Sequence, residues 1–79
     1  MDKVRINFVP LEELQGVFGI GKQRTHRIIR MRKAGTNVTA KDLKLWCASS
    51  RTIKAFDYEA NPKVSNVDKH VELPDDPED

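Results

Sequence analysis

The stretch Val17-Phe18-Gly19-Ile20-Gly21-Lys22 lies between two segments with helical patterns and leaves room only for a tight connection. Glycine lacks a Cβ atom and adopts positive φ without strain, so two glycines in three positions permit a sharp reversal. Ile20 between them can anchor the turn in the core. Because a helix begins directly after the turn, its unpaired amides and positive dipole end favour an anionic oxygen. The sequence therefore predicts a reversal with an anion-binding end, beside the cations Lys22 and Arg24.

A short helix of about two turns is predicted before this reversal. Pro10 suits a first-turn position, and Glu12-Glu13 lie near the positive helix end. Leu11 and Leu14 face inward. Gly16 closes or weakens the helix.

A longer helix is predicted over residues 21–33, because residues 22–33 contain no glycine or proline and Ala34-Gly35 supplies a stop. Its helical periodicity places Thr25, Ile28, Ile29 and Met31 on one side. Arg32 falls within this apolar arc, where its stem can pack while the guanidinium reaches water or a carbonyl. Arg24 lies at the border. The opposite side carries the polar residues Lys22, Gln23, His26, Arg27, Arg30 and Lys33.

The flanking segments add an extended lead-in and a third helix. Val4, Ile6 and Phe8 alternate with polar residues, which is typical of an extended segment with one side toward a core. Thr39 followed by Asp42 resembles a capping box, so a helix is expected to begin there. On that helix Leu43, Trp46 and Cys47 share one face and are expected in the core, with Leu45 half exposed. The spacing of Ile53, Phe56 and Tyr58 does not define a conformation.

Charge divides the chain into two unlike parts. Residues 1–54 carry twelve Lys and Arg against four acids, a net charge of +8, whereas residues 55–79 carry two Lys against eight acids, a net charge of −6. Six of the bases fall within residues 22–33 with no acid among them, as in nucleic-acid binders, although a solvated helix face would look the same. The C-terminal Leu-Pro-Asp-Asp-Pro-Glu-Asp lacks periodicity. We therefore expect one domain over residues 1–58 and an acidic, mostly disordered tail over residues 59–79.

Several classes of protein are disfavoured by composition. A chain of 79 residues forms one small domain at most. The single cysteine, Cys47, excludes an internal disulfide, and the spacing of His26, Cys47 and His70 does not suit zinc. No uncharged stretch, residues 6–11 included, is long enough to span a bilayer, and nothing near the start resembles a secretion signal. No acid/base pair is held in place for catalysis. We expect a non-enzymatic, soluble protein of a reducing compartment, cytoplasm or nucleus.

The ordered pattern resembles the helix-hairpin-helix family of DNA-binding domains, and especially the variety in bacterial competence-type DNA-uptake proteins. The matching residues are Ile6-Asn7, Glu12-Glu13-Leu14, Gly19-Ile20-Gly21, Ile28-Ile29 with Arg32, the break at Gly35, and the start of the third helix at Thr39 to Leu43. The resemblance implies a small all-α domain with three helices. The sequence also departs from the family pattern. Phe18 and Lys22 stand where proline is common, Thr25 stands where alanine usually packs, and a second Gly-x-Gly is missing.

The resemblance implies sequence-independent contact with DNA phosphates. The residues it assigns to DNA binding are Gly19, Ile20, Gly21, Lys22, Gln23, Arg24, His26 and Arg27. It also implies a monovalent cation at the hairpin carbonyls as an optional bridge to a phosphate. No other cofactor or metal is expected.

Two alternatives to this function remain open at the level of sequence. The two glycines could serve only to pack two helices, in a protein-interaction module whose basic helix meets an acidic partner or the chain's own tail. The domain could also target a larger DNA-processing enzyme to its substrate. Strand preference, oligomeric state, organism and the role of the tail do not follow from the sequence.

Overall fold

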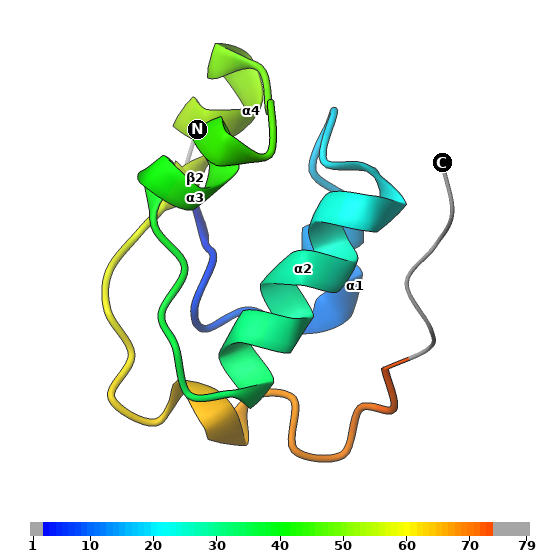
Figure 1. Ribbon diagram of the computed structural model, residues 1–79, viewed down its shortest axis with the longest axis vertical. Helices are drawn as coiled ribbons and strands as arrows, with labels where there is room; N and C mark the ends of the chain where they lie inside the picture. Colours follow the sequence, from blue (N-terminus) through cyan, green and yellow to red (C-terminus); the bar gives the residue numbers. More distant parts are fainter. Residues whose placement is uncertain (1–2, 74–79) are drawn as a thin grey trace.

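The computed structural model describes residues 3–73 and is mostly helical over that range (Figure 1). Its elements, in chain order, are β1 (Val4–Arg5), α1 (Leu11–Gln15), α2 (Gly21–Lys33), α3 (Ala40–Leu45), α4 (Ser50–Lys54), β2 (Phe56–Asp57) and the 3-10 helix η1 (Val64–Asn66). The sequence predicted an all-α class, and its coarser part, a small and mostly helical protein, is confirmed. The expected set of three helices is extended by α4, and a short two-stranded sheet is added.

The two helices around the reversal begin and end where local signals place them. α1 starts after Pro10 and is followed by Gly16, and Leu14 is buried. α2 covers residues 21–33 and is followed by Gly35, whose φ of +83° lets the chain leave the helix. Both helices contribute to one core, made of Ile6, Leu14, Ile20, Ile28, Ile29, Val38, Leu43 and Phe56.

α3 begins at the predicted capping residue but ends sooner than its apolar pattern suggested. The Asp42 carboxylate accepts a hydrogen bond from the Thr39 main-chain N–H at 2.9 Å, as a capping box requires. The helix ends at Leu45, so Cys47 lies beyond it with a φ of +61°. Cys47 is exposed, and its expected place in the core is wrong because the helical periodicity stops before it. Leu43 is buried, Trp46 is partly buried, and Leu45 is 71% exposed.

The chain after α3 forms α4 and the second strand of the sheet. The Ser49 hydroxyl accepts a hydrogen bond from the Thr52 N–H at 3.2 Å, which caps α4. β1 and β2 pair in parallel, with Val4 opposite Phe56 and Arg5 opposite Asp57. The predicted extended lead-in is therefore confirmed at Val4–Arg5, but it gives way to a turn from Ile6 onward.

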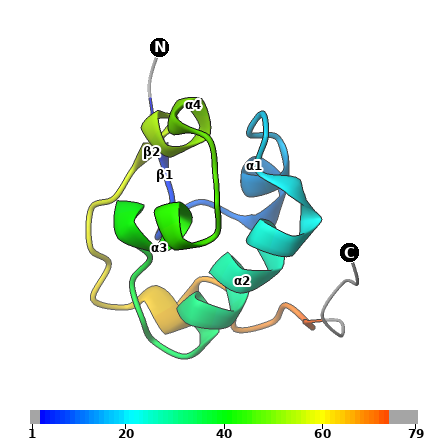
Figure 2. The same ribbon diagram turned by 45° about the horizontal axis from the view of Figure 1, so that its top comes forward.

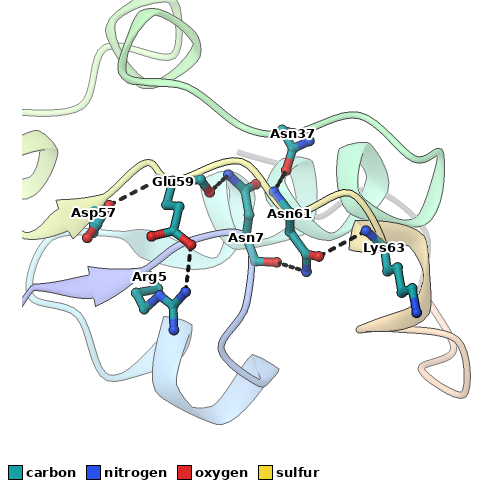
Figure 3. Close-up of polar contacts among 7 residues, drawn as sticks. All are labelled: Arg5, Asn7, Asn37, Asp57, Glu59, Asn61 and Lys63. Carbon is teal, nitrogen blue, oxygen red and sulfur yellow. Dashed lines mark hydrogen bonds and ion pairs between the residues drawn. The ribbon is translucent and has the colours of Figure 1, made fainter.

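A buried asparagine joins three segments that are distant in sequence (Figure 3). The Asn7 side chain is fully buried, and its amide donates to the carbonyls of Val38 and Glu59 at 3.1 Å each. Its oxygen accepts from the Val38 N–H at 2.7 Å. Asn61 donates in turn to the Asn7 carbonyl at 2.8 Å. The lead-in, the loop before α3 and the chain after β2 are thus bound together at one point.

The segment after residue 58 packs against α2, contrary to the expected disorder. Val64 is buried, and η1 contacts α2. The Asp68 carboxylate accepts two hydrogen bonds of 2.6 Å from the Arg32 guanidinium, which also donates to the Ile6 carbonyl at 2.9 Å. Arg32 thus reaches a carbonyl, as predicted. It also binds the Asp68 carboxylate, which the helical pattern did not predict. The predicted boundary at residue 58 cuts through this packing, so residues 59–73 belong with the domain; residues 74–79 of the predicted tail lie outside the described residues.

Candidate nucleic-acid interface

The hairpin, residues 17–21, is a tight reversal with its central side chain in the core. Gly19 and Gly21 have φ of +81° and +72°, a region that favours glycine. Ile20 is only 3% exposed, and its N–H donates to the Val17 carbonyl at 3.2 Å. The turn geometry and the anchoring role predicted from the sequence are both confirmed.

The start of α2 leaves main-chain donors open. Within residues 3–73, no main-chain hydrogen bond to another backbone group has the N–H of Gly19, Gly21 or Lys22 as its donor. Ile20, which precedes the helix, supplies no side-chain cap. Gly19, Gly21 and Lys22 are all exposed. These N–H groups lie at the positive end of the α2 dipole, where a negatively charged oxygen is stabilised.

The hairpin carbonyls, by contrast, already accept hydrogen bonds. The Phe18 carbonyl accepts from the Thr52 hydroxyl at 3.1 Å, and the Gly19 carbonyl accepts from Arg24 Nη1 at 3.4 Å. The Gly21 carbonyl accepts from the Thr25 hydroxyl at 2.8 Å. Because the positive Arg24 guanidinium donates to one of these oxygens, the arrangement does not fit a monovalent cation.

Arg24 is partly buried, and its guanidinium is bound by main-chain carbonyls of the protein itself. Its Nε donates to the Trp46 carbonyl at 3.0 Å, and its Nη2 donates to the Cys47 carbonyl at 2.9 Å. With the contact to Gly19, the guanidinium joins the hairpin to the end of α3. Arg24 therefore positions the hairpin. No local pattern predicts this role, because two of its partners are carbonyls of a distant segment.

The other residues assigned to DNA contact differ in their exposure. His26 is 7% exposed, so its predicted place on the solvent side of the helix is wrong. The buried face of α2 is wider than its apolar residues alone indicated, because it also includes polar residues. Gln23 and Arg27 are partly buried, and the Arg27 guanidinium carbon lies 6.0 Å from the centroid of the Trp46 ring. The exposed group that the structure brings together is therefore Gly19, Gly21 and Lys22.

An aromatic side chain beside this group was not among the predicted contacts. Phe18 is 76% exposed, and the Arg51 guanidinium carbon lies 5.0 Å from the centroid of its ring. α4, which carries Arg51, lies at the same end of the molecule as the hairpin (Figure 2). The sequence marked Phe18 only as a departure from the family, and Arg51 could not be placed because α4 was not predicted.

A cavity of about 590 Å³ adjoins the start of α2. Its lining is largely apolar and includes Leu11, Ile29, Val71 and Leu73, with Gly21 and Lys22 also on its wall. Among the described residues, no group of His, Cys, Asp and Glu is placed to hold a metal ion. None of the helices in residues 3–73 has the length and apolar character needed to cross a membrane.

Comparison with known proteins adds no family assignment, since no family model, curated protein or solved structure matches this chain.

Proposed function

We propose that this domain binds DNA without sequence preference, through backbone phosphates held by the hairpin and the N-terminus of α2. One observation carries the proposal: the N–H groups of Gly19, Gly21 and Lys22 have no backbone acceptor within residues 3–73 and lie in exposed residues beside the exposed Lys22 side chain. A phosphate oxygen fits this environment because it accepts several N–H bonds and pairs with an ammonium.

The same geometry explains why no base sequence is read. Main-chain amides and a lysine contact phosphate oxygens, which are alike at every position of a duplex. With about two to four phosphates neutralised, log K falls against log salt with a slope of about −2 to −4, and the dissociation constant at physiological salt is about micromolar or weaker. Such a module acts best as one of several linked sites in an oligomer or a larger DNA-processing protein.

The rival function, a hairpin that serves only packing in a protein-interaction module, is favoured by one contact. A Cβ atom on Gly19 would lie 2.6 Å from the Thr52 hydroxyl, so the hairpin packs tightly against α4 whether or not it binds DNA. This contact requires glycine at residue 19. It makes no use of the exposed N–H groups beside Lys22, which suit a phosphate oxygen, and we therefore favour DNA binding.

The test is a matched pair of lysine variants titrated with duplexes of unrelated sequence. Lys22 follows the hairpin, whereas Lys63 is an exposed lysine just before η1, which packs against α2 (Figure 3). Lys22→Gln and Lys63→Gln remove the same charge, so a purely long-range effect appears in both.

We expect Lys22→Gln to weaken binding to every duplex alike and to reduce the salt slope by about 1. Lys63→Gln should leave the slope unchanged. Equal behaviour of the two variants would contradict a phosphate contact at the hairpin.

A further inference from the structure

The hairpin presents a large apolar side chain to solvent at the place where the proposed phosphate site lies. Within residues 3–73, Phe18 and Leu45 are the large hydrophobic residues that remain exposed, at 76% and 71%. Burial of a phenylalanine side chain stabilises a fold, so the exposure of Phe18 forgoes that stabilisation. A single exposed hydrophobic side chain is common on protein surfaces and does not by itself indicate a binding site. The residues around Phe18 are what indicate one.

Phe18 is held in place by its main chain and has a cation beside its ring. Its carbonyl accepts the hydrogen bond from Thr52, which is 1% exposed, and Gly19 follows with positive φ. The Arg51 guanidinium carbon lies 5.0 Å from the ring centroid, within the range of a cation–π contact. The backbone at Phe18 is therefore held by these contacts, and the ring makes a cation–π contact with Arg51 while most of its surface stays open.

A ring and a guanidinium side by side are suited to a nucleobase. Proteins that hold single-stranded nucleic acid stack bases on aromatic side chains, with arginine adding cation–π attraction. In an intact duplex each base is already stacked and paired within the helix, so a ring at the backbone cannot reach its face. A base in a gap or a single strand has no such restriction. The adjacent N–H groups would hold the phosphate of the same strand.

We propose that Phe18 and Arg51 form a stacking platform for one unpaired nucleobase, so that the preferred ligand is DNA containing unpaired bases. This inference rests on the proposed function, because the hairpin must first hold the phosphate backbone. It adds a specificity that phosphate contacts alone do not provide.

The experiment compares two gapped duplexes that have the same number of phosphates. One carries ordinary thymidines in the single-stranded gap, and the other carries abasic nucleotides at the same positions. An intact duplex of the same length serves as the third ligand. The variants are Phe18→Ala, Phe18→Trp and, as the matched control, Leu45→Ala at the other exposed apolar residue. Binding is measured by fluorescence anisotropy.

The wild-type protein should bind the thymidine gap at least about fivefold more tightly than the abasic gap, because stacking of one base contributes about 1–3 kcal/mol. Phe18→Ala should abolish that ratio while leaving affinity for the intact duplex nearly unchanged. Phe18→Trp should keep or increase the ratio, and Leu45→Ala should leave it unaltered.

The contrary results separate the two proposals. If the wild-type protein binds all three ligands equally, or if Phe18→Ala keeps the wild-type ratio, the stacking platform is refuted and phosphate binding stands. If Phe18→Ala weakens the intact duplex as much as the gap, Phe18 acts on the hairpin and not on a base. If no ligand binds at low salt, the proposed function fails together with this inference.

Discussion

Replacing Asp68 by Asn tests whether the chain after residue 58 is part of the fold. Asp68 is 1% exposed and Arg32 is fully buried, and the two side chains share two hydrogen bonds of 2.6 Å. Asparagine keeps the shape but places an amide against the guanidinium and leaves the arginine charge without a counter-ion. Breaking a buried ion pair in this way costs about 3–5 kcal/mol.

That loss is large for a domain of this size. Unfolding free energies of small proteins are about 5–15 kcal/mol, so Asp68→Asn should remove a large part of the total. With a melting-temperature shift of about 4–8 °C per kcal/mol, the expected decrease is on the order of 10–40 °C, read by circular dichroism during heating.

The chain supplies a matched control in an exposed ion pair. Arg5 and Glu59 lie 2.8 Å apart, with side chains 49% and 58% exposed. Glu59→Gln removes the same charge, and its expected cost is at most about 1 kcal/mol because solvent screens the pair. If Asp68→Asn melts within a few degrees of Glu59→Gln, residues 59–73 are not held to α2 as described. For the same reason, a truncation meant to test the acidic tail in DNA binding should begin after residue 73.

Two further predictions concern the hairpin and pH. Gly19→Ala should destabilise the domain more than Gly35→Ala, as denaturant unfolding would show: both positions have positive φ, but only at Gly19 does the new Cβ meet Thr52, at 2.6 Å, whereas nothing lies within 4 Å at Gly35. Equal losses would contradict the close contact. Burial raises the pKa of Tyr58 from 10.0 to about 12, and its hydroxyl donates to the Ile53 carbonyl at 2.6 Å. The folded state therefore favours the neutral ring, so this stabilisation is complete below pH 10 and is lost as pH rises to 12. Tyr58→Phe should lose less stability across that interval, and an identical loss would exclude this cause.

Features that depend on neighbouring residues were predictable from the sequence. The two glycines of the hairpin, the stop at Gly35 and the capping residue Thr39 act within a few positions of themselves, and each appears where expected. The burial of Ile28 and Ile29 also follows from helical spacing alone.

Features that depend on partners far away in the chain were not predictable from the sequence. Arg24 reads as a surface cation until the carbonyls of Trp46 and Cys47 are placed beside it. Asp68 reads as one of many acids in a polar segment until it meets Arg32. In both cases a charged residue is bound by a segment that lies far away in the chain, and no local pattern predicts such a contact.

The most direct test of the phosphate contact is an NMR titration of the labelled protein with a short blunt duplex at low and moderate salt. We predict that the largest amide shifts occur at Gly19, Gly21, Lys22 and Gln23, diminish as salt rises, and leave η1 unaffected. Shifts centred on η1 or the surrounding loop, or no shifts at the hairpin at low salt, would contradict the account.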